Sequence, residues 1–335
     1  REKLGLYLSL GGACITLGPA FGPVISDLMC TLFGWRAVFV VPLVGGIVVA
    51  AAGVKHVQNV GERSNTTLDI LSVVLLAAGV TAFVYSVGEF STDLITGIVT
   101  LFAAIVLLGL FAARQLKLEH PVLNVRPMAS VRFWPACLLV VVSMMTTFSM
   151  SVLLPLYFEG AYGMTALIAG LLILPAIACN AVTSIVGGRV MDARGAWPLL
   201  PVGFALIAVG QTAISMTAAS MNIGVVVALT VVVYAGVGLV LSPSQTAGLE
   251  TLPASEHPHG TALLNTWNMI AASFGPSLFI GLLSSSAATA GAAGVATDVA
   301  QAIGFAAAVR VAAVIAVVGF VASLVYARRE SHMSH

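Results

Sequence analysis

Long apolar stretches, separated by short polar segments, follow one another along almost the whole chain. A helix needs roughly 20 mostly apolar residues to cross the hydrocarbon core of a bilayer. Within that core the backbone N–H and C=O groups must be satisfied inside the segment, as they are in a helix. Membrane barrels alternate apolar and polar residues along each strand, and these stretches do not. We therefore predict an all-α, polytopic helical membrane protein.

The overall composition agrees with this class. Hydrophobic residues make up 59% of the 335 residues and charged residues only 8%, whereas about a quarter of a soluble protein is charged. Most of the 14 Lys and Arg residues are isolated, so we expect no nucleic-acid partner. His257 and His259 lie in a Pro-containing loop without a further ligand nearby, and no catalytic or nucleotide-binding motif occurs. We expect no metal, no cofactor and no enzymatic activity.

Cutting the chain at charges and at Gly, Pro and Asn clusters gives ten candidate spans. They are Leu4–Ile25, Ala37–Val54, Ile70–Gly88, Leu94–Ala113, Phe133–Phe158, Met164–Gly188, Leu199–Ser220, Ile223–Leu249, Gly260–Ser285 and Ile303–Tyr326. The stretch Ala196–Leu249 has no charged residue, and as one helix it would be about 80 Å long, far longer than a bilayer is thick. We therefore predict that it folds back at Ser220-Met221-Asn222.

The basic residues sort to one side of the membrane when successive spans alternate in direction. Of the 14 Lys and Arg residues, only Arg36 falls on the opposite side, and Arg310 lies inside the last span. An excess of Lys and Arg marks the short cytoplasmic loops of membrane proteins. We therefore place the basic side and both chain ends in the cytoplasm, with the spans in a plasma or inner membrane.

The first span contains the motif Gly18-Pro19-Ala20-Phe21-Gly22-Pro23. Gly11, Gly18 and Gly22 fall near one helical face, because spacings of seven and four residues are close to whole turns. Small residues on one face let another helix approach closely, and prolines remove backbone donors and favour a bend. We predict a tightly packed, kinked helix suited to a gating interface between two bundles.

Further short motifs follow in order along the chain. They are Trp35-Arg36-Ala37-Val38-Phe39, Leu68-Asp69-Ile70, Pro121-Val122-Leu123, the tract at 154–163, the tract at 169–175, the tract at 187–195 and the tract at 260–266. In order and spacing, these motifs and the glycine–proline motif resemble the major facilitator superfamily, specifically its fourteen-helix drug–proton antiporter branch.

The resemblance implies that the ten spans are helices five to fourteen of the family fold. Residues 1–57 would complete an N-terminal bundle, 58–116 form an inserted helix pair, 117–132 a cytoplasmic linker and 133–335 a six-helix C-terminal bundle. The chain starts without Met, and we expect a truncation that leaves the first four helices, with the usual coupling carboxylate, upstream. We also expect a monomer.

The segment Gly188-Arg189-Val190-Met191-Asp192-Ala193-Arg194-Gly195 lies at a predicted cytoplasmic turn between two helices. Asp192 there can meet helix N-terminal donors or a neighbouring Arg, which would form a charged latch that breaks when the bundles move. Alternatively, Arg189 and Arg194 are ordinary positive-inside anchors. The resemblance favours the latch.

Polar residues within or near the ends of the spans are the candidates for substrate or proton contact. Asp27 and Glu159 lie near the external ends of their spans. A carboxylate there either titrates during transport or lies in a water-filled external opening. The other candidates are Tyr157, Asn180, Gln245, Asn265 and Trp267. Each of these either lines a cavity or bonds neighbouring helices together.

Together these features predict a secondary transporter that exports amphipathic small molecules, cations among them, in exchange for protons by alternating access. The expectation that the substrates are drugs and that the coupling ion is the proton follows from the resemblance alone. The alternatives are a dedicated exporter of one metabolite, peptide or lipid-like compound, an integral membrane enzyme, and an inactive truncated transporter.

Overall fold

The structure is a computed structural model in which residues 22, 25–26, 28–30, 32–56, 69–89, 93–118, 121–131, 133–197, 199–253 and 256–331 are described. Its helices are η1 (Trp35–Phe39), α2 (Val40–His56), α3 (Ile70–Glu89), α4 (Leu94–Lys117), η2 (Arg126–Ala129), α5 (Phe133–Tyr162), α6 (Ala166–Arg194), α7 (Leu199–Thr217), η3 (Ala218–Ser220), α8 (Ile223–Glu250), α9 (His257–Ala292) and α10 (Thr297–Ser331).

The described residues form nine helices long and apolar enough to cross a membrane, each at the position of a predicted span. The all-α, multi-pass membrane fold is therefore confirmed. Of the first predicted span, Leu4–Ile25, only Gly22 and Ile25 are described.

Side-chain caps explain where several helices begin. Thr165 begins α6 by accepting from the Ile168 N–H at 3.4 Å. Asp93 begins α4 by accepting from the Ile95 N–H at 3.0 Å and from the Thr96 hydroxyl at 2.6 Å. The Thr96 hydrogen bonds, followed by that of Ile95, lower the pKa of Asp93. These bonds satisfy backbone donors that the first helical turn leaves open.

The chain folds back inside its charge-free stretch at the predicted place. Helix α7 ends in the short helix η3, and Met221 then adopts a left-handed backbone with φ of 53°. Asn222 begins α8 because its side chain accepts from the Val225 N–H at 3.3 Å. A left-handed residue followed by an Asn cap reverses the chain within a few residues, so the predicted turn is confirmed.

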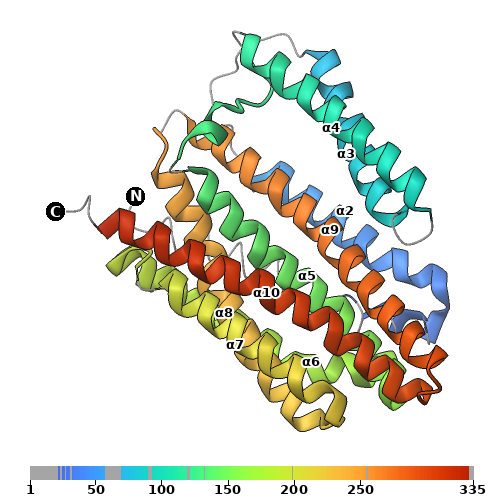
Figure 1. Cartoon of the computed structure of the whole chain (residues 1–335). Coiled ribbons are helices and arrows are strands. Elements are labelled where there is room, and N and C mark those ends of the chain that lie inside the picture. The colour runs from blue at the N-terminus through green and yellow to red at the C-terminus, as the bar shows by residue number, and fades with distance from the viewer. Residues whose placement is uncertain are drawn as a thin grey trace.

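Helices α5 to α10 form one bundle, and α8 packs closely on α6 and on α7 (Figure 1). A methyl group added at Gly236 would lie 2.5 Å from the carbonyl oxygen of Gly203 in α7, and one at Gly238 would lie 2.6 Å from the carbonyl oxygen of Asn180 in α6. Two glycines within one turn of α8, on opposite sides of the helix, thus allow backbone contact with both neighbours. With larger residues at positions 236 and 238, α8 could not pack this closely on α6 and α7.

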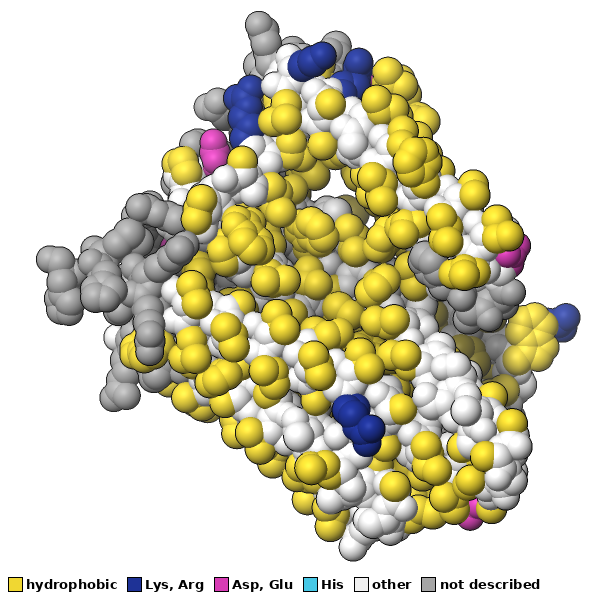
Figure 2. Space-filling view, viewed as in Figure 1, with side chains coloured by type: hydrophobic (Ala, Val, Ile, Leu, Met, Phe, Trp, Pro, Cys, Tyr) yellow, Lys and Arg dark blue, Asp and Glu magenta, His cyan; other side chains and the backbone are white. Residues whose placement is uncertain are grey.

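Helices α3 and α4 form a separate hairpin that lies beside the bundle (Figure 1). Gly79 fits against Leu108 within the hairpin, and the Phe83 ring stacks on Phe274 of α9 with ring centroids 6.0 Å apart. Lys and Arg side chains gather at the end of the hairpin where α3 begins and α4 ends (Figure 2). None of the described side chains of α2 is buried.

Candidate functional site

The exposed faces of α9 and α10 differ in chemistry. The exposed large hydrophobic residues of α10 are all valines: Val311, Val314, Val317, Val318, Val321 and Val325. On α9, Met269 is the one large hydrophobic residue exposed among those described, and the exposed polar residues are Thr261, Asn265, Ser277, Ser284, Ser285 and Thr289. We call these two surfaces the α10 valine face and the α9 polar face.

The two faces suit different surroundings in a membrane. Valine side chains pack favourably against lipid tails, whereas polar side chains in a span face protein or water. The hydroxyls of Thr261, Ser277 and Thr289 donate to carbonyls of their own helix, which lowers the free-energy cost of placing them within the membrane. The carboxamide of Asn265 is exposed and makes no hydrogen bond with any described residue. The α9 polar face therefore fits an aqueous path or a covering helix. The α10 valine face fits lipid, and the exposed Arg310 on the same face has a side chain long enough to extend towards the headgroups.

Helix α9 also contains the glycine–proline step that the sequence shares with the first span. Gly275 is buried, and a methyl group there would lie 2.8 Å from Ser149 Oγ and 3.2 Å from the Cα atom of Met145 in α5. Pro276 follows and removes one backbone donor from the middle of the helix. Helices bend at such positions, so the close contact with α5 and the weak point of α9 coincide.

Polar atoms behind the α9 polar face are not all paired. Ser149 Oγ of α5, which lies against Gly275, and Asn268 Oδ1 of α9 are buried and have no hydrogen-bond partner in the described part of the chain. An unsatisfied buried polar group costs about 1–3 kcal/mol. The interface between α5 and α9 is therefore held less firmly than a fully apolar one would be.

The predicted contact residue Asn180 lies inside the bundle instead of on the α9 polar face. It is 2% exposed, and its amide donates to the carbonyl of Tyr234 in α8 at 3.0 Å. The Tyr234 hydroxyl lies 3.1 Å from the Ser151 hydroxyl of α5. These contacts tie α5, α6 and α8 together, which is the geometry of interhelical hydrogen bonding.

Tyr157 is also fully buried, at the opposite end of α5 from the linker. Its hydroxyl donates to the carbonyl of Ala218 at 2.8 Å, and its ring stacks on Phe305 with centroids 4.3 Å apart. Glu159, two residues later, is partly exposed. Tyr157 therefore joins α5 to the η3 turn and α10, while Glu159 stays within reach of solvent or of a headgroup.

Three other predicted residues reach the surface on neighbouring helices. Gln245 of α8 and Trp267 of α9 are partly exposed, and Asn265 is exposed. All three lie in the halves of α8 and α9 that meet at the connection between them. Unlike Asn180 and Tyr157, these three residues therefore reach the surface of the bundle, and their contact with a substrate stays a prediction.

The segment 188–195 ends α6. Gly195 has a positive φ of 75°, and its N–H donates to the Met191 carbonyl at 2.9 Å. Gly188 is buried, whereas Arg189 and Asp192 are exposed about one turn apart. The carboxylate of Asp192 repels that of Glu250 at the end of α8, whereas His257 at the start of α9 attracts it. The charged turn thus faces the connection between α8 and α9, and the side chain of Arg194 is outside the described part.

The glycine–proline motif falls almost wholly outside the described residues. Gly18, Pro19, Pro23 and Asp27 are not described, and Gly22 is an exposed helical residue with open space around it. Its proposed gating role stays a prediction. The Trp-Arg motif that follows forms η1, where the Arg36 guanidinium lies 5.2 Å from the centre of the Trp35 ring, a cation–π distance.

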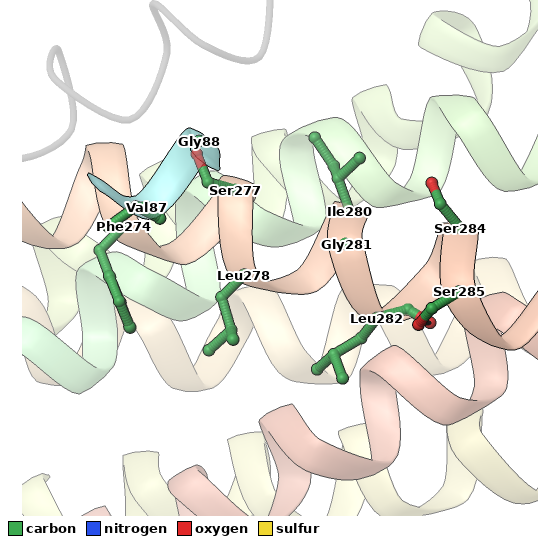
Figure 3. Close-up of a pocket in the computed structure, with 10 residues that line it drawn as sticks. All are labelled: Val87, Gly88, Phe274, Ser277, Leu278, Ile280, Gly281, Leu282, Ser284 and Ser285. Atoms are coloured by element: carbon green, nitrogen blue, oxygen red, sulfur yellow. Dashed lines mark hydrogen bonds between the residues drawn. The ribbon is translucent and has the colours of Figure 1, made fainter. Parts of the chain in front are cut away.

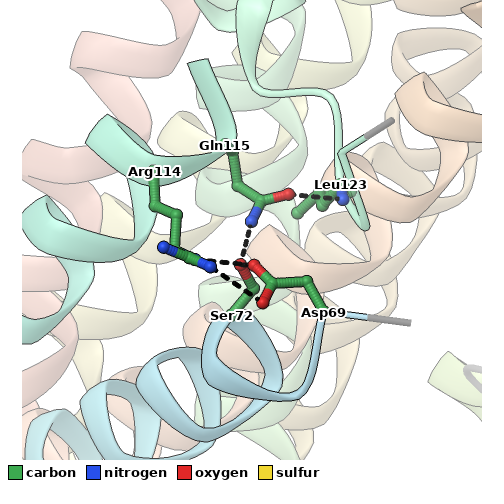
Figure 4. Close-up of polar contacts among 5 residues, drawn as sticks. All are labelled: Asp69, Ser72, Arg114, Gln115 and Leu123. Atoms are coloured by element: carbon green, nitrogen blue, oxygen red, sulfur yellow. Dashed lines mark hydrogen bonds and ion pairs between the residues drawn. The ribbon is translucent and has the colours of Figure 1, made fainter. Parts of the chain in front are cut away.

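A polar network that sequence reasoning did not assemble joins the hairpin to the linker (Figure 4). The Arg114 guanidinium donates twice to Asp69, at 2.6 and 3.0 Å, and the Ser72 hydroxyl donates to the same carboxylate at 2.5 Å. The buried amide of Gln115 donates to Ser72 and accepts from the Leu123 N–H at 3.1 Å. This α3–α4 clamp therefore fixes the start of the linker to both helices of the hairpin.

The electrostatics of the α3–α4 clamp are those of a permanent ion pair. The hydrogen bond from Arg114, followed by that from Ser72, lowers the pKa of Asp69 from 3.8 to about 2. Asp69 and Arg114 stand 45 residues apart in sequence, so no short motif joins them. The sequence offered one indication of this pair: Asp69 directly precedes one predicted span, and Arg114 directly follows the next.

Comparison with known proteins places the chain among membrane transporters. Residues 1–276 match the family described as Major Facilitator Superfamily. Lincomycin resistance protein LmrB of Listeria monocytogenes is 31% identical over 287 residues, which are 85% of this chain and 61% of that protein. The uncharacterized MFS-type transporter YcnB of Bacillus subtilis is 32% identical over 327 residues, 96% of this chain and 68% of that protein.

A more distant relative has a related name. Multidrug resistance protein B homolog of Mycobacterium tuberculosis is 24% identical over 289 residues, 84% of this chain and 54% of that protein. The chain spans about three fifths of the length of the lincomycin resistance protein that it matches.

Proposed function

The chain belongs to the major facilitator superfamily of membrane transporters, and from this premise we propose that its whole protein exports amphipathic drug-like molecules in exchange for protons. The relatives named for lincomycin or multidrug resistance support export of small molecules. The proposal places the transporter in the plasma membrane with both ends of this chain in the cytoplasm, because the basic loops gather on that side.

The observation that carries the proposal is the contrast between the α9 polar face and the α10 valine face. Alternating access needs one bundle whose outer surface meets lipid and whose inner surface meets the transported molecule and a second bundle. The α9 polar face is the surface of the bundle least suited to lipid. Asn265, Trp267 and Gln245 lie on or beside it and are the residues proposed to touch the substrate.

The proposed cycle uses the weak points of the bundle. Gly275 and Pro276 let α9 bend against α5, which changes the shape of the α9 polar face without unpacking α6, α7 and α8. The charged turn at Arg189 and Asp192 acts as the cytoplasmic latch, and Gly18, Pro19, Gly22 and Pro23 form part of the gating interface. Glu159 and Asp27 are the candidates in this chain for a titrating carboxylate.

The test is efflux of a fluorescent cation from energised cells that express the full-length protein and lack their own exporters. Asn265→Leu is expected to lower the initial efflux rate at least fivefold, because it replaces the exposed amide by a lipid-like side chain. Val314→Leu on the α10 valine face is the matched control and should leave the rate within twofold. Equal rates in all three proteins would contradict the assignment of the α9 polar face.

A further inference from the structure

A groove of about 970 Å³ lies between α3 and the half of α9 farther from the linker (Figure 3). Val87 and Gly88 of α3 stand at one end of it, next to Phe274 and Ser277 of α9. From there the groove follows α9 to Ser284 and Ser285. Sites for drug-sized ligands have volumes of about 300–1,000 Å³, so the groove has the capacity of a whole small molecule.

Two glycines hold the groove open. Apart from the nearby backbone of the same helix, no atom of the described residues lies within 4 Å of the position that a Cβ atom would take at Gly88 or at Gly281. These glycines differ from Gly236, Gly238 and Gly275, which are small because a neighbouring helix touches them. Glycine costs a helix about 1 kcal/mol relative to alanine, and a methyl group at Gly88 or Gly281 would meet no described atom of a neighbouring helix. Gly45, Gly46 and Gly109 have similar open space, but of these five glycines only Gly88 and Gly281 line the groove.

The lining gives the chemistry of an occupant. It is apolar along Val87, Phe274, Leu278 and Ile280, and hydroxyl groups stand at Ser277, Ser284 and Ser285. The Ser277 and Ser285 hydroxyls donate to carbonyls of α9, which leaves their oxygens able to accept. Ser284 makes no hydrogen bond with a described residue.

None of the described residues that line the groove is charged. The nearest carboxylate along α3 is that of Glu89, and the Tyr85 hydroxyl hydrogen-bonds to it. A cation placed in the groove would therefore lose hydration without gaining a counter-charge, which is costly in low dielectric. An uncharged molecule with one hydrogen-bonding end loses much less.

We propose that the groove between α3 and α9 is a second binding site, which takes an uncharged amphipathic molecule with its apolar body against Phe274 and Leu278 and its polar end at Ser285, whose side chain points to the same side of α9 (Figure 3). The inference rests on the proposed function in one respect, namely that the occupant belongs to the class of molecules exported. Ser277, Ser284 and Ser285 belong both to the groove and to the α9 polar face, so a molecule held in the groove touches one end of the surface proposed for transport.

The experiment measures binding of Nile red, an uncharged environment-sensitive dye, to the purified full-length protein in detergent. Saturable binding is expected, and Gly281→Leu and Gly88→Leu are each expected to weaken it at least tenfold by filling the groove. Gly109→Leu is the matched control, because Gly109 on α4 also has open space around it and does not line the groove. It should leave the affinity within twofold. Unchanged affinity in both groove variants would overturn the inference.

A second arm separates a small molecule from a lipid acyl chain. Binding is repeated in phosphatidylcholine nanodiscs, where the dye is expected to keep its Gly281-dependent affinity. Loss of this component in nanodiscs would show that lipid fills the groove and would overturn the inference. Failure of the two proposals is distinguishable: dye binding that depends on Gly281 without any efflux contradicts only the exporter, and efflux with Gly281-independent binding contradicts only the groove.

Discussion

Single residues fix the most strained and the most polar points of this fold. Gly236 and Gly238 permit the contacts of α8, Met221 supplies the left-handed turn, and Asp69 with Arg114 forms an ion pair at the end of the hairpin. Each of these residues occupies a position that its chemistry permits and that most other side chains would disturb. Substitutions there have definite expected results.

The α3–α4 clamp is expected to protect the linker from local opening. In Gln115→Leu the Leu123 N–H loses its acceptor, so we expect its amide hydrogen to exchange at least tenfold faster. Hydrogen–deuterium exchange of the peptide around 118–131 measures this in the full-length protein. Lys117→Gln, an exposed neighbour on α4, should not change the exchange. Equal protection in wild type and Gln115→Leu would show that the linker is held in another way.

The α3–α4 clamp should also be insensitive to physiological pH. The pKa of Asp69 is lowered in the folded protein, so its stabilising contribution is present above pH 4 and is lost as the pH falls towards about 2. Between pH 8 and 5 the linker protection, corrected for intrinsic exchange, should stay constant. A loss with a midpoint between pH 5 and 7 would contradict the ion pair and would make Asp69 a candidate coupling residue.

Gly238→Ala should destabilise the bundle by about 1–3 kcal/mol, because the new methyl group meets the Asn180 carbonyl and the Thr183 hydroxyl and forces α6 and α8 apart. Thermal unfolding of the purified full-length protein measures the change. Gly109→Ala adds the same methyl group where space is open and should leave the protein as stable or slightly more stable. A Gly238→Ala protein as stable as wild type would show that this contact is looser than described.

At the scale of whole helices, sequence predicted most of the architecture and little of the site. Apolar length and flanking charges located the spans from Trp35–Lys55 to Thr297–Tyr326, because crossing a bilayer imposes a length on every helix. The same reasoning could not tell which polar residue faces which helix. Asn180 and Asn265 look alike in sequence, yet one bonds α8 inside the bundle and the other is exposed. The direction in which a side chain points depends on the rotation of its helix and on packing against other helices, and neither can be read from the sequence of one span.

The faces of α9 and α10 give a direct test at this scale. Single cysteines are introduced at Asn265, Ser277 and Val314 of a full-length protein whose native cysteines are replaced. A membrane-impermeant maleimide, applied to inside-out and right-side-out vesicles, should label positions 265 and 277 at least tenfold faster than position 314 in one of the two orientations or states. Equally slow labelling at all three positions would contradict an aqueous α9 polar face.

At the scale of the molecule, the described residues form a bundle of six helices, α5 to α10, with helix α2, a clamped hairpin beside the bundle and a polar face on α9. Membership of the major facilitator superfamily makes it part of a transporter, while the chain spans about three fifths of the lincomycin resistance protein. In the proposed function, the residues described here supply one wall of the path and the movements of α9.

The most direct measurement of the central claim is transport by the full-length protein in liposomes. Ethidium, whose permanent charge prevents passive trapping, is supplied outside vesicles with an acidic lumen. We predict that it accumulates inside as protons leave, that collapsing the pH gradient stops accumulation, and that protein-free liposomes show none. Accumulation that is unchanged when the gradient is collapsed, or no accumulation of ethidium and of an uncharged dye alike, would contradict a proton-driven drug exporter.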